Sequence, residues 1–379
     1  TSVLRADFER RMNSPISPVS RPLRALLAAL ALLPASLFAA TEIHVAPGGN
    51  DANPGTVAQP VATPQEAQVR VRALIQASLS NAVDVVFAAG TYALDAPLEL
   101  RPEDSGTAAF PITWQAATNA TVVLSGGKRI TGTWTNGGNG IWFTDLTGVG
   151  LGTNQWNFRQ LFVNGTRITR ARYPNVTQAN PFLYATGGST NYVIINPALV
   201  KSNWGTAADA QINIVPQSRF FNQWNTVTAV NTNTGRIDLA ASERHRLIDS
   251  GSWFWIEGVQ AELDEPNEWF LNPTTGRLYY MPTNGVDPNT LEFVAPYLNR
   301  IINVKGDVNA GTHVQYVNFD GLEFRHTDFT LGQIEARVAT DTAIMFENTL
   351  DTSVKNCHFE NMGGYALWLH LDSQHNVFD

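Results

Sequence analysis

The sequence predicts an all-β protein whose main body is a parallel β-helix, a solenoid of stacked coils. Short β-rich runs separated by Gly, Asn, Asp and Pro fill most of the chain after residue 80. One C-terminal segment repeats another at a spacing of 23 residues, with no helix between them. Only one convincing helix lies outside the N-terminal leader.

The repeat appears when AIMFENTLDTSV (343–354) is set over ALWLHLDSQHNV (366–377). The matched pairs are Ala343–Ala366, Ile344–Leu367, Phe346–Leu369 and Val354–Val377. A second match sets NFDGLEF over SVKNCHF at an offset of 35, pairing Phe319 with Val354 and Phe324 with Phe359. The L-x-x-L-x-L pattern of leucine-rich repeats is absent, so a parallel β-helix fits better.

The N-terminus has the pattern of a secretory leader. In RPLRALLAALALLPASLFAA, Arg21 and Arg24 precede an apolar run and then small residues. The apolar run over 25–33 is too short to span a bilayer. We expect a signal peptide over about 12–40, starting at Met12, and a secreted or periplasmic protein without a membrane anchor. Residues 1–11 are then upstream of the true start.

Composition narrows the classes of partner. The 379 residues are 44% hydrophobic and 15% charged, which is typical of a globular protein. Residues 1–40 contain five arginines and two acids, which leaves 20 basic and 31 acidic side chains and a net charge of −11. Without a Lys/Arg cluster, no nucleic-acid partner is predicted. The single cysteine, Cys357, excludes an internal disulfide and is expected to be a small core residue. The oligomeric state is not indicated.

The expected helix begins after Thr63, which is a good N-cap before Pro64. Glu66 completes a T-x-x-E capping box. An apolar face with helical spacing is predicted at Val69, Ala73, Leu74 and Ala77. We expect this helix to cover the open N-terminal edge of the solenoid.

Between residues 131 and 294 the runs become longer and richer in aromatics. Asn164-Gly165 in VNGT predicts a two-residue hairpin, and LNPTTGRLYY (271–280) predicts another. We therefore predict the first coils at 41–130, an inserted antiparallel β module at 131–298, and further coils at 299–379. Residues 1–40 form the leader region.

Several motifs together resemble a known family. In order, they are IHVAPGGNDANPGT, AAGTYALDAPLEL, GGKRITG, FRQLFVNGTRITRARYPN and ELDEPNEWFLNPTTGRLYY, followed by the closing coils. Over roughly 41–379 the chain resembles secreted bacterial glycoside hydrolases of family 141 and, more loosely, family 120. The resemblance implies a right-handed parallel β-helix with an inserted β module, and hydrolysis of poly- or oligosaccharides in the fucosidase, xylanase or xylosidase direction. It also implies an N-terminal fragment, inactive alone, whose true catalytic acids lie beyond residue 379.

Strand alternation predicts a functional face within the repeat. If Leu367, Leu369 and Leu371 point inward, then Trp368, His370 and Asp372 point outward. The 23-residue register places Met345 beside Trp368 and Glu347 beside His370. We expect Glu347 and Asp372 as candidate catalytic carboxyls, with Trp368 and His370 binding substrate. The alternative is a half-buried Trp368 under the inserted module, with ordinary surface polar groups around it.

Two further motifs supply candidate substrate-binding residues. RHTDF contains His326 and Asp328 in a predicted loop, where function is common. RARYPN contains Arg170, Arg172 and Asn175. The alternatives are a turn or cap role for Asp328, and salt bridges that fix the inserted module for the arginines. No metal or cofactor motif appears; Ca²⁺ sites occur in β-helices, but no acidic ligand string marks one.

The predicted function is glycoside hydrolysis by a carbohydrate-active enzyme. A polysaccharide lyase can share the same solenoid, but it usually needs Ca²⁺ and a basic cleft, which a net charge of −11 disfavours. A non-enzymatic surface adhesin would show regular repeats without an aromatic insert. The aromatic insert therefore favours the enzyme.

Overall fold

The computed structural model describes residues 39–150, 155–219, 222–240, 249–330 and 341–379, and residues 40–379 form one compact unit. The predicted signal peptide lies outside the described residues except for Ala39 and Ala40. The described chain is mostly β-strand, with one α-helix, α3 (Pro64–Gln76). The short 3-10 helices are η1 (Pro102–Asp104), η2 (Pro197–Leu199), η3 (Ser202–Gly205), η4 (Gln260–Glu262) and η5 (Pro288–Thr290). No helix of these residues is long and apolar enough to cross a membrane.

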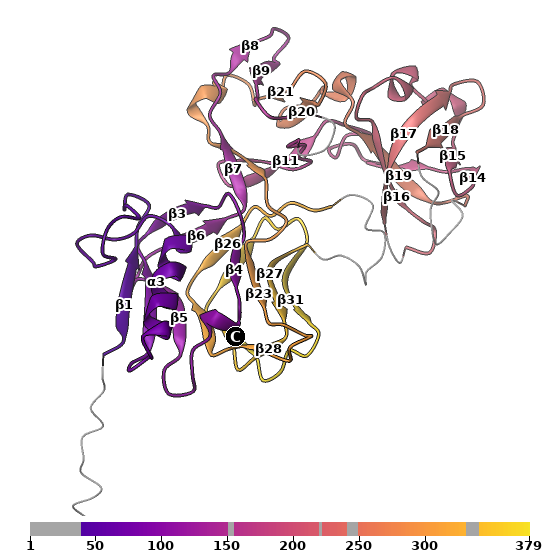
Figure 1. The fold of residues 1–379 in the computed structure, drawn as a ribbon. Coiled ribbons are helices and arrows are strands. Elements are labelled where there is room, and N and C mark those ends of the chain that lie inside the picture. The colour runs from indigo at the N-terminus through magenta and orange to yellow at the C-terminus, as the bar shows by residue number, and fades with distance from the viewer. Residues whose placement is uncertain (1–38, 151–154, 220–221, 241–248, 331–340) are drawn as a thin grey trace, which may run out of the picture. The chain divides into compact units, whose positions relative to one another are not determined.

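Three sheets have only parallel neighbours, and they form the three-sheet region (residues 41–125 and 298–379) (Figure 1). The first parallel sheet contains β1 (Thr41–Val45), β2 (Val83–Phe87), β5 (Ile112–Ala116), β25 (Val317–Asp320), β29 (Ser353–Lys355) and β32 (Val377–Phe378). The second contains β3 (Gly90–Ala93), β6 (Val122–Ser125), β26 (Glu323–Arg325) and β30 (His358–Glu360). The third contains β4 (Leu98–Leu100), β23 (Ile302–Lys305), β27 (Thr342–Glu347) and β31 (Tyr365–His370).

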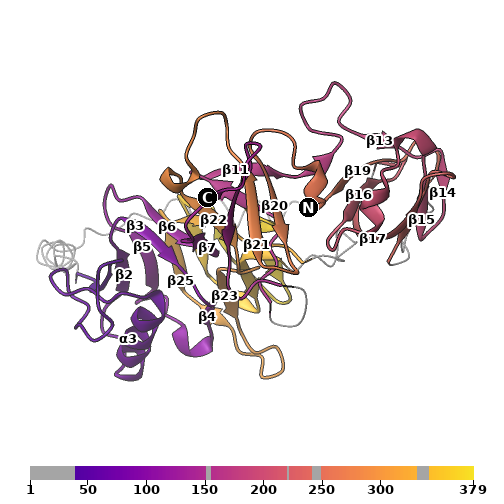
Figure 2. The ribbon, with the colours of Figure 1, turned by 90° about the horizontal axis from the view of Figure 1, so that it is seen from above.

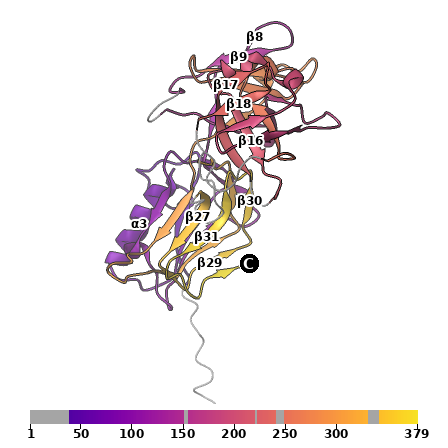
Figure 3. The same ribbon diagram turned by 90° about the vertical axis from the view of Figure 1, so that its right-hand side faces the viewer.

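The chain visits these sheets in a fixed cyclic order, from the first to the second to the third. This order holds from β2 to β6, and it resumes with β23 and continues to β32. A small parallel pair, β24 (Val314–Gln315) and β28 (Thr349–Leu350), lies between visits to the third and first sheets. Strands far apart in sequence, such as β4 and β23, therefore lie side by side (Figure 3 shows β27 and β31 of the third sheet together).

The predicted repeat register is confirmed in the third sheet and is wrong by one residue in the first. Ile344 pairs with Leu367 and Phe346 with Leu369, as expected. Val354, however, pairs with Phe378 and not with Val377. The spacing between paired residues changes from 23 in the third sheet to 24 at the bridge between Leu350 and Gln374, which lies before the first sheet is reached. One extra residue therefore enters the turn after β31.

The core of the three-sheet region consists of rows of apolar side chains that cross the sheets. Leu98, Ile302 and Ile344 form one such row in the third sheet, and all three are buried. Phe324 is fully buried and stacks on Phe359 of the next strand, with ring centroids 4.9 Å apart, which confirms the 35-residue offset. Burial of these rows fixes the register, because a slip by one residue would turn every apolar side chain outward.

Helix α3 starts as predicted, but of the predicted apolar face only Leu74 packs against the core. The Thr63 side chain accepts a hydrogen bond from the Glu66 amide, at 3.1 Å. Asp51, and not Glu66, accepts from the Thr63 amide, so only half of the capping box forms. The helix packs on the core through Ala67 and Val71, at i and i+4 spacing. Val69 of the predicted face is 58% exposed, so that part of the prediction is wrong.

The middle segment (residues 127–296) forms two sheets that are almost entirely antiparallel. One contains β7 (Gly127–Ile130), β8 (Thr135–Asn136), β9 (Trp142–Asp145), β10 (Leu161–Val163), β11 (Thr166–Arg170), β20 (Glu268–Asn272), β21 (Arg277–Met281) and β22 (Phe293–Pro296), with only β11 and β20 parallel. The other contains β12 (Arg172–Tyr173), β13 (Leu183–Tyr184), β14 (Gly187–Gly188), β15 (Tyr192–Ile194), β16 (Gln211–Val215), β17 (Gln223–Asn231), β18 (Arg236–Leu239) and β19 (Trp253–Glu257) (Figure 2).

Both predicted hairpins of the middle segment are confirmed. Val163 pairs with Thr166, and the two turn residues Asn164 and Gly165 have φ of 48° and 78°, as a type I′ turn requires. Strands β20 and β21 form the second hairpin. The expected limits of the inserted module, 131–298, remain a prediction.

Candidate functional site

The outward positions of the third parallel sheet bring several predicted residues together. Residues that alternate with the buried row point to the opposite face. Glu347 on β27 is the register partner of both Lys305 on β23 and His370 on β31. Two residues earlier on β27, Met345 pairs with Trp368. Both neighbour relations inferred from the repeat are therefore confirmed. Lys305, Glu347, Trp368 and His370 form what is called here the outer-face patch.

Glu347 supplies the carboxylate of the outer-face patch. Its side chain is only 10% exposed and lies between Lys305 Nζ at 2.9 Å and His370 Nδ1 at 3.5 Å. Burial alone would raise the pKa of Glu347, but the hydrogen bonds and charges of Lys305 and His370 outweigh burial and lower it. Glu347 is therefore ionised at neutral pH, as a nucleophile or general base requires.

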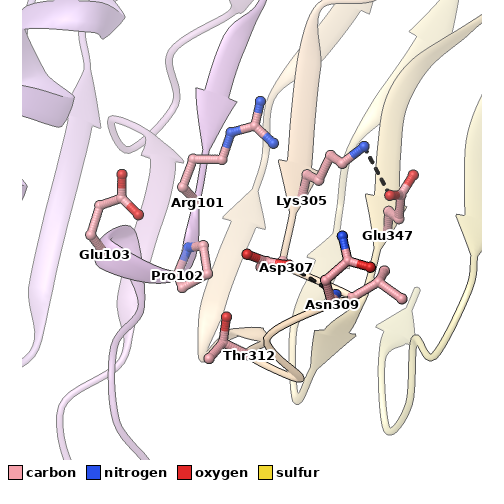
Figure 4. A pocket seen from close by; sticks show the side chains of 10 residues that line it. Arg101, Pro102, Glu103, Lys305, Asp307, Asn309, Thr312 and Glu347 are labelled. Atoms are coloured by element: carbon pink, nitrogen blue, oxygen red, sulfur yellow. Dashed lines mark hydrogen bonds and ion pairs between the residues drawn. The ribbon is translucent and has the colours of Figure 1, made fainter.

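An open polar hollow of about 620 Å³ leads to Glu347 from the strand ends. Figure 4 shows three charged side chains side by side at the strand ends: Arg101 directly follows β4, Lys305 ends β23 and Glu347 ends β27. The turn below them carries Asp307, Asn309 and Thr312. Arg101 is paired with Glu99, which also accepts hydrogen bonds from Asn303. The hollow is thus lined by charged and amide groups that can bind hydroxyls.

Trp368 extends the outer-face patch toward β31. Its ring is half-buried and lies 4.8 Å from the His370 ring. This half-burial agrees better with the alternative of a half-buried Trp368 than with a fully exposed ring. The remaining exposed ring surface still offers an apolar plane beside a carboxylate and an imidazole.

Asp372 lies beyond the end of β31, so strand alternation does not extend to it, and its place beside the outer-face patch stays a prediction. Strand β31 ends at His370, and Leu371 has a positive φ of 40°. The Asp372 carboxylate bonds to His313 Nε2 at 2.9 Å and to the Gln374 side chain. Because Asp372 lies in the turn that gained one residue, alternation along β31 does not determine its direction. Its side chain is 50% exposed.

A second hollow of about 420 Å³ lies where the middle segment meets the three-sheet region, and we call it the junction cleft. The residues that define it here are Arg159, Arg167, Arg170, Trp224, Glu257 and Phe329. The sequence prediction names only Arg170 among them. Arg167 lies on the same strand, β11, but is not part of that prediction, and the others come from segments that are distant in sequence.

Asp328 lies next to the junction cleft. It precedes Phe329, and its carboxyl accepts a hydrogen bond from Gln160, another cleft residue. Burial raises the pKa of Asp328 to about 6, against the lowering effects of the Phe329 amide, the Arg159 charge and Gln160. A carboxyl with this pKa can change protonation in the working range of many enzymes.

His326, in contrast, belongs to the interior. It is 6% exposed, its Nδ1 lies 3.1 Å from Ser125 Oγ, and its ring packs on Phe162 at 4.8 Å. Burial, followed by the Arg325 charge, lowers the pKa of His326 to about 4, so the ring is neutral. The predicted substrate-binding role does not fit this burial, since a ligand cannot reach the imidazole.

Arg170, Arg172 and Asn175 are all buried. Arg170 pairs with Asp209 at 2.5 Å and with Glu257 at 2.9 Å. Both carboxylates belong to the middle segment, so these bridges join its two sheets rather than the module to the solenoid as the sequence alternative held.

Arg172 and Asn175 hold the chain around the cis Tyr173-Pro174 bond. Arg172 donates to the carbonyls of Pro174 and Pro181, and burial lowers its pKa to about 10. Asn175 donates to Asp264 at 2.8 Å. A substrate-binding role for Arg172 and Asn175 does not fit these satisfied, buried contacts.

The two hollows lie near opposite ends of β27. Asp341, whose charge acts on Asp328, immediately precedes β27, whereas Glu347 is the last residue of that strand. Six residues at about 3.3 Å each separate Asp341 and Glu347 by about 20 Å. Asp328 and Glu347 are therefore too far apart to act on one glycosidic bond, which requires carboxyls within about 10 Å.

Among the described residues, no group of three or more His, Cys, Asp or Glu side chains is arranged to hold a metal ion. Glu347 is neutralised by Lys305 and His370 instead. The outer-face patch presents carboxylate, imidazole and ammonium groups.

No protein-family model and no curated protein matches the sequence. Among solved structures, the chain is similar to one described as "Glycoside hydrolase", with a TM-score of 0.72 and 23% identity over 86% of this chain and 63% of that chain. A weaker alignment to "The complex structure of XylC with xylose" has a TM-score of 0.33 and 15% identity, and covers 86% of this chain and 43% of that one. The chain thus has a glycoside hydrolase-like fold and spans about 63% of the first structure's length.

Proposed function

We propose that this chain belongs to an exported carbohydrate-active enzyme that hydrolyses glycosidic bonds, and that the outer-face patch is part of its substrate site. The carrying observation is the ionised, nearly buried Glu347 between Lys305 and His370, with Trp368 alongside. A sugar ring that packs its apolar face on Trp368 would present its hydroxyls and anomeric carbon to this carboxylate.

The finer parts of the proposal follow the sequence resemblance. The cyclic visiting order of the three parallel sheets supports a right-handed parallel β-helix, with residues 131–298 as the inserted module. Likeness to glycoside hydrolase family 141, and more loosely to family 120, gives the fucosidase, xylanase or xylosidase direction. Export through the leader over about 12–40 is part of the same proposal.

In this mechanism Glu347 is the anionic partner, because Lys305 and His370 keep it ionised. It would act as nucleophile or general base, while a second carboxyl protonates the leaving oxygen. Asp372 is proposed as that second carboxyl on the strength of its exposure and its proximity in sequence to β31. Its hydrogen bonds to Gln374 and His313 lower its pKa, so these bonds must break before the carboxyl can donate a proton. Its bond to His313 offers a route for proton exchange.

The test is hydrolysis of aryl α-L-fucosides and aryl β-D-xylosides by the longer protein that the resemblance implies, as wild type and as Glu347→Gln, because residues 1–379 are expected to be inactive alone. Loss of a catalytic carboxylate should lower kcat about 100- to 10,000-fold. Glu292→Gln, at an exposed position paired with Arg129, is the matched control and should retain full activity. Hydrolysis that survives in Glu347→Gln would contradict the role of the outer-face patch.

Asp372→Asn separates the two proposed roles. If Asp372 is the proton donor, substrates with a good aryl leaving group should be hydrolysed almost normally, while natural glycosides should be lost. Equal loss on both substrate types would argue for a structural role through His313.

One observation favours a second candidate function, a polysaccharide lyase. Lyases need cationic groups near the sugar carboxylate, and the junction cleft contains several arginines. Cleavage without water uptake would produce an unsaturated sugar, detectable by its ultraviolet absorbance. A hydrolase produces none, so one assay on a uronate polymer distinguishes the two.

A further inference from the structure

Two arginines of the junction cleft form no direct ion pair within the described part of the chain, although Asp209, Asp328 and Glu257 act on the charge of Arg159 from a greater distance. Arg170 is neutralised by Asp209 and Glu257, but among the described residues neither Arg159 nor Arg167 forms a salt bridge with a carboxylate. An arginine has five N–H donors in a planar fork that matches a carboxylate. Both side chains therefore retain donor capacity toward a ligand.

The contacts that these arginines do make hold them in place. Arg159 donates to Gln211 Oε1 and to the Asn157 carbonyl, each at 3.3 Å. Arg167 donates to the Met362 carbonyl at 3.0 Å, across from the middle segment to the three-sheet region. Neutral partners orient a guanidinium without cancelling its charge, so Arg167 keeps positive charge available in the cleft, whereas nearby carboxylates partly offset the charge of Arg159.

Aromatic rings form another wall of the junction cleft. Trp224 and Phe329 lie 5.9 Å apart, one from each side of the junction, and both are half-buried. Trp224 is also held edge-to-face by Trp255 at 6.0 Å. Fixed aromatic faces beside charged donors suit a ligand with an apolar ring face and an anionic group. The volume of about 420 Å³ is within the range of small-ligand sites.

We propose that the junction cleft binds a hexuronate residue of an acidic glycan, with Arg159 and Arg167 on the sugar carboxylate and Trp224 and Phe329 on the ring. The inference rests on the proposed carbohydrate function for the class of ligand. To that function the inference adds a second binding site and a negative charge on the substrate. Since the cleft and Glu347 lie near opposite ends of β27, one glycan chain that occupies both must be an oligosaccharide.

The test measures binding apart from hydrolysis. Isothermal titration of the purified chain uses three probes: trigalacturonic acid, its methyl ester and xylotriose. The acidic trimer should bind at least tenfold more tightly than either neutral trimer, and raised salt should weaken it. Arg167→Gln should weaken the acidic trimer about tenfold or more, because a charge-assisted pair is lost.

Arg129→Gln, at an exposed arginine on β7, is the matched control and should bind like wild type. Arg159→Lys keeps the charge but removes the fork, so it should give an intermediate loss. Circular dichroism verifies folding of each variant, and Arg167→Lys replaces Arg167→Gln if that variant does not fold. Equal affinity for acidic and neutral trimers, no binding, or an unaffected Arg167 variant would overturn the inference.

Glu347→Gln separates this inference from the proposed function. It should bind the acidic trimer normally, since the junction cleft lies about 20 Å away along β27. Acidic-trimer binding that depends on Arg167, together with no glycoside hydrolysis by the longer protein, would overturn the hydrolase proposal and support the binding site. Hydrolysis that depends on Glu347 without acidic-trimer binding would support the hydrolase proposal and overturn the inferred binding site.

Discussion

Replacing Glu268 by Gln should make the protein more stable at alkaline pH than wild type. Glu268 is 2% exposed, and its Oε2 accepts the amide hydrogens of Asp264 and Glu265. Its Oε1 is buried without a partner among the described residues. Burial raises the pKa of Glu268 from 4.5 to about 7, although the two amides oppose this.

The sign and size follow from proton linkage. A carboxyl whose pKa is raised by folding contributes stability that is fully present below about pH 4.5 and is lost as the pH rises through about 7. The full difference corresponds to about 3 kcal/mol, of which about 2.5 kcal/mol falls between pH 5 and pH 8. Gln keeps an acceptor for the two amides but carries no charge. Its advantage over wild type should therefore grow by this amount over that range.

Urea unfolding followed by tryptophan fluorescence at pH 5, 6, 7 and 8 measures this difference. Asp328, with a pKa raised to about 6, and His326, with a pKa lowered to about 4, also titrate on unfolding with opposite signs. Both are present in wild type and variant, so their effects cancel in the comparison. Glu292→Gln, at an exposed carboxyl on another turn, is the control for the general effect of removing one carboxylate. A flat or falling difference for Glu268→Gln would refute the reasoning.

Three further predictions concern stability, each measured by urea unfolding at pH 7. Phe324→Ala should cost about 3–5 kcal/mol, because Phe324 is fully buried and stacked on Phe359, and Phe324→Leu should cost clearly less. Arg170→Met should cost about 3–5 kcal/mol by leaving Asp209 and Glu257 buried without their cation; a loss below 1 kcal/mol would contradict this. Thr63→Ala should cost about 1 kcal/mol through the lost N-cap, whereas Thr63→Ser should be nearly neutral.

The sequence was most informative where burial alone determines the structure. Ile344 and Leu367 can be matched from one sequence because inward strand positions must be apolar, and that match also places Glu347 beside His370. The predicted register fails at Val354, which pairs with Phe378 and not with Val377, because turns tolerate an added residue without changing the apolar pattern. The junction cleft could not be found from sequence, since Arg159, Trp224 and Phe329 come together only through long-range packing.

The helix shows the same limit on a smaller scale. Thr63 and Pro64 mark the start of α3 because capping is a local interaction. Which face is buried depends on the sheet that the helix meets, and Ala67 with Val71 serves this role while Val69 stays exposed. Hydrophobicity within the segment could not distinguish these faces.

The lone thiol provides an intrinsic reporter of local opening. Cys357 lies between β29 and β30, packs against the core, and has a pKa raised to about 11 by burial. At pH 8 only about one thiol in a thousand is then ionised, so a disulfide reagent should label the folded protein very slowly. When these strands separate, the thiol regains ordinary acidity and reacts at once. The labelling rate of Cys357 therefore reports how often this part of the three-sheet region opens, without any engineered probe.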